Sequence, residues 1–146
     1  MEDKMTEINK EINLFQFPPS KSPQLLNPIV LAYIGDAVFE VFIRQFVISK
    51  PNHKPHHLHH LTTQYVSAKA QAKILKDIMP ILNEEEMYVV RRGRNAKSNT
   101  IPKNAEVLDY RHSTAFECLI GYLYYMQEYD RLQEILNLSI AQIQTN

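Results

Sequence analysis

The sequence is poor in glycine and contains almost no cysteine. Its 146 residues include three glycines, one cysteine and no tryptophan. The single cysteine, Cys118, excludes a disulfide within the chain and is typical of a reducing compartment, so we expect a cytoplasmic location. The scarcity of glycine, together with long apolar runs of helical period, favours helices over a sheet of short strands.

The chain also lacks a net charge and a membrane-directed segment. Sixteen basic and sixteen acidic residues balance, so a basic surface for nucleic acid would have to be local. The N-terminal stretch MEDKMTEINKEINLFQF lacks the apolar core and cleavage site of a signal peptide. Residues 28–48 are long enough to cross a bilayer, but three charged residues interrupt them: Asp36, Glu40 and Arg44. We therefore expect no membrane association.

The hydrophobic pattern predicts one all-α domain. A helix should begin at Pro28, with Asn27 as its N-cap, and end near Ser49. Further helices are expected over residues 58–76, 83–94, 113–129 and 130–144. Asn83 should cap the third helix and Gly93 should weaken or end it. Most of residues 95–112 should be loop, residues 1–22 a weakly ordered extension, and residues 23–146 the folded domain.

Two carboxylates lie in apolar stretches, Asp36 in YIGDAVFE and Glu117 in STAFECLIGYLYY. A buried ionised carboxylate is costly without a partner. The simpler interpretations put Asp36 on a solvated helix face and Glu117 in a capping box with Thr114. The alternative interpretation is that Asp36 and Glu117 lie close together in space and form one site. Carboxylates that converge from two helices suit magnesium, which lowers the pKa of a bound water and stabilises charge on a phosphate under attack.

Positive charge is concentrated in one segment. Between residues 87 and 105 there are five basic residues and no acidic one: Arg91, Arg92, Arg94, Lys97 and Lys103. They either form a solvated helix face balanced by the glutamates at 84–86, or leave a positive patch in a neutral chain.

Two other groups of residues are weaker candidates for chemistry. The segment HKPHHLHH supplies five histidines, but no cysteine or second cluster completes a tetrahedral zinc site. We therefore expect a polar helix start there. Cys118 and His112 could be drawn as a nucleophile and its base, but Cys118 lies in an apolar helix and is expected to be a core thiol.

Several segments resemble one enzyme family. IGDAV at residues 34–38 resembles the ribonuclease III signature, and FECLIGYLY at residues 116–124 resembles the second conserved block of that family. QYVSAKAQAKIL and RRGRNAKSNTIPKN resemble the short subfamily called Mini-ribonuclease III. The similarity runs in consistent order over about residues 26–126.

This resemblance implies a fold and an activity. It implies an all-helical homodimer that hydrolyses double-stranded RNA with Mg2+, leaving 5′-phosphate and 3′-hydroxyl ends, and that uses Asp36 and Glu117 as catalytic and metal-binding residues. It also implies precursor 23S ribosomal RNA as the substrate and a large-subunit ribosomal protein as a candidate partner. The five basic residues would then contact RNA phosphates.

The chain departs from full-length ribonuclease III at two expected ligands. Ala32 stands in place of a glutamate and Thr114 in place of an aspartate. The Mini subfamily shares this reduced pattern, so the number of metal ions stays open, and waters or a phosphate would complete the coordination. Glu40 is expected to be solvated or to act through a water.

The sequence leaves no room for a separate double-stranded RNA-binding domain, so the nuclease domain should hold RNA alone. The rival hypothesis is a non-catalytic RNA-binding or ribosome-assembly module.

Overall fold

The computed structural model describes residues 14–51, 53–96 and 106–144, and this part of the chain is helical without a strand. With η marking short 3-10 helices, the elements are η1 Pro23–Leu25, α2 Pro28–Ser49, η2 Pro55–His57, α3 Leu58–Val66, α4 Ala68–Ile78, η3 Met79–Ile81, α5 Glu84–Asn95, α6 Val107–Tyr125 and α7 Tyr129–Gln144. The predicted all-α fold is confirmed. Within these ranges no helix is both long and apolar enough to span a bilayer.

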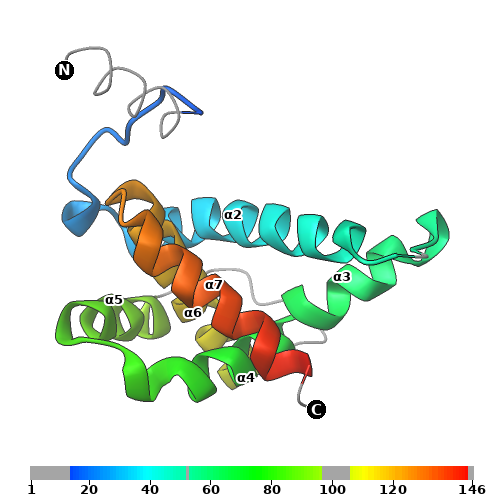
Figure 1. Cartoon of the computed structure of the whole chain (residues 1–146). Helices are drawn as coiled ribbons and strands as arrows, with labels where there is room; N and C mark the ends of the chain where they lie inside the picture. Colours follow the sequence, from blue (N-terminus) through cyan, green and yellow to red (C-terminus); the bar gives the residue numbers. More distant parts are fainter. Residues whose placement is uncertain (1–13, 52, 97–105, 145–146) are drawn as a thin grey trace.

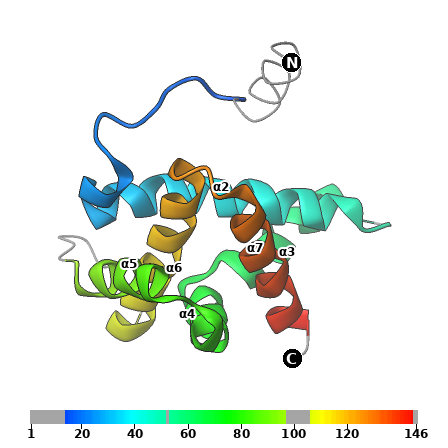
Figure 2. The same cartoon turned by 60° about the vertical axis from the view of Figure 1, so that its left-hand side comes forward.

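Helix α6 forms the centre of the fold. α2, α4, α5 and α7 all pack against it, and Figures 1 and 2 show it between α2 on one side and α4 and α5 on the other. Nearly every residue from Ser113 to Leu123 is buried. A helix that is apolar around its circumference belongs in a core. Here Phe116 meets Phe39 of α2 edge to face, with ring centroids 5.0 Å apart.

Helix α2 begins and ends where the sequence predicts. The Asn27 side chain accepts a hydrogen bond from the backbone N–H of Ile29 at 2.8 Å, and Pro28 occupies the first turn. Its buried face repeats about every fourth residue: Leu31, Gly35, Phe39, Ile43 and Val47. The opposite face carries exposed apolar side chains.

The single helix expected over residues 58–76 is wrong, because Ser67 divides it. Ser67 is extended (φ −62°, ψ 155°) and follows the last residue of α3. Its hydroxyl accepts a hydrogen bond from the backbone N–H of Ala70 at 3.2 Å, so it caps α4. The break allows α3 to pack on α2 while α4 packs on α6.

Helix α5 has the predicted cap and ends within one residue of the predicted range, and Gly93 does not end it. The Asn83 side chain accepts from the Glu86 N–H at 2.8 Å, and the Glu86 carboxylate accepts from the Asn83 N–H at 3.0 Å, which completes a capping box. The helix continues through Gly93 to Asn95. A Cβ at Gly93 would lie 2.9 Å from the Cα of Ala115 and from the Cβ of Cys118. Glycine therefore permits the close contact of α5 with α6, and this packing outweighs its poor helix propensity.

Helix α6 is displaced toward the N-terminus relative to the prediction. It begins at Val107 instead of Ser113, so residues 107–112 are helix and not loop. The hydroxyls of Ser113 and Thr114 donate to the carbonyl of Tyr110 at 2.8 and 3.0 Å, which satisfies them within a helix. It ends at Tyr125, and Gln127 then adopts a left-handed conformation (φ 58°).

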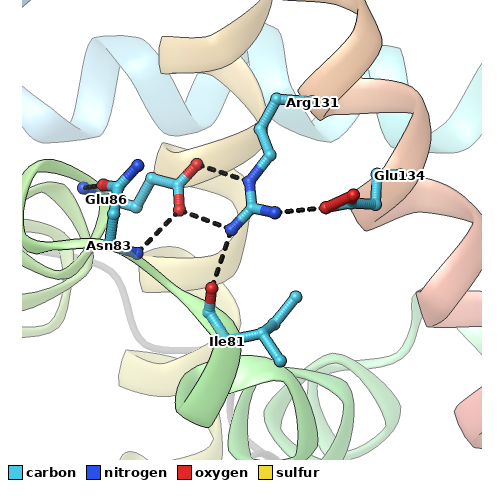
Figure 3. A network of polar contacts seen from close by, with 5 residues as sticks. All are labelled: Ile81, Asn83, Glu86, Arg131 and Glu134. Atoms are coloured by element: carbon cyan, nitrogen blue, oxygen red, sulfur yellow. Dashed lines mark hydrogen bonds and ion pairs between the residues drawn. The ribbon is translucent and has the colours of Figure 1, made fainter.

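A polar network fastens α7 to α5 (Figure 3). Arg131 donates to both carboxylate oxygens of Glu86 at 2.8 Å and to the Ile81 carbonyl at 2.9 Å, and it also pairs with Glu134. Burial by itself would raise the pKa of Glu86, but the hydrogen bonds from Arg131 and from the Asn83 backbone outweigh it and lower that pKa. The network fixes the start of α5, the helix that carries the arginines.

The segment that precedes η1 is largely exposed where it is described. Leu14, Phe15 and Phe17 all present most of their surface to solvent. Residues 1–13 lie outside the described residues. The division into an extension over 1–22 and a domain over 23–146 stays a prediction.

Candidate active site

Asp36 and Glu117 meet where α2 crosses α6. A Cβ at Gly35 would lie 1.8 Å from the carbonyl oxygen of Glu117, and one at Gly121 would lie 2.0 Å from that of Leu31. The two backbones are therefore in direct contact, an approach that only glycine allows. Asp36 follows Gly35 on α2, and Glu117 lies one turn before Gly121 on α6, so the glycine crossing brings the two carboxylates together.

The two carboxyl groups are coupled. The Glu117 side chain hydrogen-bonds that of Asp36, and Asp36 is exposed whereas Glu117 is partly buried. Burial raises the pKa of Glu117 to about 9, with further contributions from the hydrogen bond and the charge of Asp36, while a hydrogen bond from Gln71 opposes the shift. A single proton therefore stabilises the pair, because two ionised carboxylates at this separation need positive charge between them.

The donor set fits a hard divalent cation. The crossing offers carboxylate oxygens, and the buried Oε1 of Gln71 has no hydrogen-bond partner among the described residues. Over the same ranges no group of three or more His, Cys, Asp and Glu side chains is placed to hold a metal. The protein thus supplies two carboxylates, and waters or phosphate oxygens would fill the remaining positions, an arrangement that magnesium commonly adopts.

Of the simpler interpretations of the two carboxylates, the capping box is wrong and the exposed position of Asp36 is confirmed. Glu117 does not close a capping box, because Thr114 lies inside α6 and donates its hydroxyl proton to the Tyr110 carbonyl. Asp36 is exposed, as a solvated residue would be, but it also contacts Glu117. The two side chains therefore lie together at the crossing of α2 and α6.

Glu40 is less solvated than expected. One carboxylate oxygen accepts from Arg44 at 3.3 Å. The other is shielded from solvent and has no hydrogen-bond partner among the residues that the structure describes. It does not form a three-carboxylate cluster with Asp36 and Glu117, so it is not placed as a third direct ligand.

Gln71 is the site residue that sequence reasoning missed. Its side chain is buried, with 1% of its surface exposed, and it lies on the apolar face of α4 with Ile74, Leu75 and Ile78. The sequence contains a usable signal, since a glutamine within an apolar stripe of helical period needs a buried polar partner. Its partners are the Val66 carbonyl, to which it donates at 3.1 Å, and Glu117, whose pKa it lowers.

The three arginines of α5 have different environments. Arg91 is exposed and Arg94 is partly buried. Arg92 donates to the backbone carbonyls of Gln24 and Leu26 at 3.2 and 3.3 Å, and its guanidinium lies 5.8 Å from the centre of the Tyr88 ring. Arg92 therefore also fastens the segment around η1 to α5. Lys97 and Lys103 lie outside the described residues.

The histidine segment and the cysteine do not form a second reactive site in the described part of the chain. The histidines at 53, 56, 57, 59 and 60 are exposed and make no metal-holding group. Cys118 is buried in the core beside α5, as expected. Burial raises the pKa of its thiol to about 12, and the nearby charge of Arg92 only partly opposes this, so the nucleophilic thiolate is rare at neutral pH.

Comparison with known proteins identifies the family of the chain. The Ribonuclease III domain family matches residues 29–128, a range that contains both carboxylates. Mini-ribonuclease 3 from Brevibacillus brevis is 51% identical over 122 residues, which cover 84% of this chain and 91% of the relative. Mini-ribonuclease 3 from Clostridium tetani is 53% identical over 116 residues, which cover 79% of this chain and 77% of the relative.

A solved structure shows the same fold. The crystal structure of protein FN1578 from Fusobacterium nucleatum aligns with a TM-score of 0.75 at 30% identity, over 84% of this chain and 98% of that one. The fold, the order of the motifs and the sequence identity therefore all indicate the same family. The chain belongs to the ribonuclease III family, in its Mini-ribonuclease 3 branch, and is an endoribonuclease.

Proposed function

We propose that this endoribonuclease depends on magnesium and cleaves double-stranded RNA, with Asp36 and Glu117 as its catalytic and metal-binding residues. The observation that carries the proposal is the carboxylate pair held at the glycine crossing of α2 and α6. Both residues lie on helices whose backbones touch, so the backbone positions that carry them are fixed before any ligand binds. Glu117 gives up its proton when positive charge arrives between the two groups. A bound magnesium ion supplies a water of lowered pKa and stabilises charge on the phosphate.

The proposed RNA-binding residues are the basic set at 91, 92, 94, 97 and 103. Arg91 and Arg94 lie on α5, which packs directly on α6 and so lies next to the helix that carries Glu117. Double-stranded RNA is recognised mainly through phosphates and 2′-hydroxyls, which a positive patch beside the cleavage site matches. Arg92 already uses donors on two carbonyls, so its share of RNA binding should be smaller.

We propose that the enzyme acts as a homodimer assembled through α2. Exposed apolar side chains follow one face of this helix at helical spacing: Val30, Tyr33, Val41 and Ile48. Tyr33 has 82% of its surface exposed. An apolar stripe of this length is typical of a protein interface, and a second copy would provide a second site for the other RNA strand. Light scattering should show a dimer at micromolar concentration and a monomer for Tyr33→Lys; a monomeric wild type would contradict the assembly.

We further propose precursor 23S ribosomal RNA as the substrate, with a large-subunit ribosomal protein as a candidate partner. This part depends on the relationship to the Mini-ribonuclease 3 proteins. Cleavage of a duplex from the ends of precursor 23S RNA should be faster than cleavage of an unrelated duplex of equal length. Equal rates, with and without the ribosomal protein, would contradict a dedicated substrate.

The central test is a cleavage assay on duplex RNA. The wild type should cleave with Mg2+, stop with EDTA, and leave 5′-phosphate ends. Asp36→Asn and Glu117→Gln keep the side-chain shape but weaken the charge that holds a cation, so both should lose cleavage and keep most RNA affinity. Asp77→Asn, which removes an exposed carboxylate paired with Lys73, is the control and should cleave normally. Cleavage by either site variant at saturating Mg2+ would show that the replaced residue is not a metal ligand. Binding by the wild type without cleavage would favour an RNA-binding module.

A further inference from the structure

The side-chain amide of Gln71 connects the end of α3 with the carboxylate site. Its Nε2 donates to the Val66 carbonyl at 3.1 Å, and the same side chain hydrogen-bonds Glu117. The Val66 carbonyl accepts and so requires the nitrogen, whose second N–H group is available to Glu117 once that carboxyl group is ionised. Glutamate has the same shape but presents only acceptors when ionised, and methionine has the same length but no donor.

Packing alone does not account for this amide. Gln71 has 1% of its surface exposed and shares its face of α4 with Ile74 and Leu75. Its Oε1 is buried without a hydrogen-bond partner among the described residues, and an unsatisfied buried acceptor costs free energy. A leucine would fill this apolar face without that cost, although it would remove the donor to the Val66 carbonyl. The amide instead has two polar neighbours, the Val66 carbonyl, to which it donates at 3.1 Å, and the Glu117 carboxyl group, whose pKa it lowers.

The break at Ser67 places the amide. Val66 is the last residue of α3, and Gln71 is in the first turn of α4, which Ser67 caps. The hydrogen bond from Gln71 to Val66 therefore spans the junction between the two helices and fixes the amide in one orientation. Because Oε1 and Nε2 belong to one planar group, the unpaired oxygen lies next to the nitrogen that donates to Val66, on the side chain that interacts with Glu117.

We propose that Gln71 is a positioning residue for the cation site, an inference that rests on the proposed function. Its Nε2 holds the Glu117 carboxylate in the orientation that faces Asp36. Its Oε1 offers an acceptor to a water in the hydration shell of the cation. Such outer hydrogen bonds orient metal ligands, and losing one commonly weakens metal affinity by about 10- to 100-fold.

The test measures cation affinity without RNA, with Mn2+ as a paramagnetic substitute for Mg2+. Titration followed by electron paramagnetic resonance should show about 10- to 100-fold weaker binding for Gln71→Met than for the wild type. The matched control is Leu75→Ala, a buried position one turn further along the same face of α4. It should lower the melting temperature but leave Mn2+ affinity unchanged. The cleavage rate of Gln71→Met should recover in large part at saturating Mg2+, because Asp36 and Glu117 are still present.

The outcomes separate this inference from the proposed function. If the wild type does not bind Mn2+, or if Asp36→Asn binds it equally well, the proposed metal site itself fails. If the wild type binds, Asp36→Asn does not, and Gln71→Met binds like the wild type, only the role of Gln71 is overturned. If Gln71→Met does not fold, nuclear magnetic resonance of the Gln71 side-chain amide in the wild type tests the inference instead. The amide resonance should shift as Mg2+ is added, and a resonance that stays fixed while the ion binds overturns the inference.

Discussion

Replacing Glu117 by glutamine should stabilise the cation-free protein at pH 8 while it removes cleavage. The folded protein raises the pKa of this carboxyl group from its usual 4.5 to about 9, through burial and then the hydrogen bond and charge of Asp36. The folded chain therefore keeps a proton that the unfolded chain releases. Stability from this group is fully present below pH 4.5 and is lost as the pH rises toward 9. Glutamine keeps the shape but does not ionise, so it avoids that loss.

The size of the effect follows from the width of the pH window. One proton held by the folded state alone changes the free energy of unfolding by about 1.4 kcal/mol per pH unit. Between pH 5 and pH 8 the wild type should thus lose at most about 4 kcal/mol. Asp36 is exposed and can turn toward solvent, which relieves part of the repulsion. We expect Glu117→Gln to exceed the wild type by about 1–3 kcal/mol at pH 8, and by almost nothing at pH 5.

Urea unfolding at several pH values between 5 and 8, in EDTA, measures this difference directly. Asp77→Asn is the control, and its difference from the wild type should be small, because an exposed ion pair contributes little to stability. Adding Mg2+ should reverse the order of wild type and Glu117→Gln, since a ligand that binds only the folded wild type stabilises it. A Glu117→Gln protein that is less stable at pH 8, or a difference that does not vary with pH, would refute this reasoning.

Three further predictions concern the supports of the site. Gly35→Ala should lower the free energy of unfolding by about 3 kcal/mol or more and weaken cation binding, because its Cβ would meet a backbone oxygen at 1.8 Å. Gly93→Ala, whose Cβ contacts would be at 2.9 Å, should lower the free energy of unfolding by less, as measured by urea unfolding. Arg131→Met should cost about 3 kcal/mol at pH 7, and much less at a pH below the lowered pKa of Glu86, where the carboxylate is protonated and the pair is already lost. Replacing the three arginines of α5, Arg91, Arg92 and Arg94, by glutamine should weaken binding to every duplex sequence. It should also flatten the slope of log affinity against log salt by about one per lost phosphate contact. An unchanged slope would show that these arginines do not contact RNA phosphates.

The sequence by itself determined the features that depend on neighbouring residues. Helical period and scarce glycine predicted the all-α fold, and Asn27 with Pro28 predicted the start of α2, because a cap acts within one turn. Asn83 and the glutamates that follow it predicted the start of α5 for the same reason. The order of short motifs also indicated the family, and with it Asp36 and Glu117 as candidate ligands.

Only the tertiary structure decided the features that depend on contacts between distant segments. Serine and glycine can each end a helix or lie within one, so the local sequence did not decide between the two at Ser67 and Gly93. Helix packing decided it: α3 ends before Ser67, and α5 continues through Gly93 in close contact with α6. The partners of Arg92, Arg131 and Gln71 lie on other elements and leave no trace in local periodicity. The raised pKa of Glu117 likewise arises only when two helices touch through glycines, because desolvation and charge repulsion depend on distance in space and not on distance along the chain.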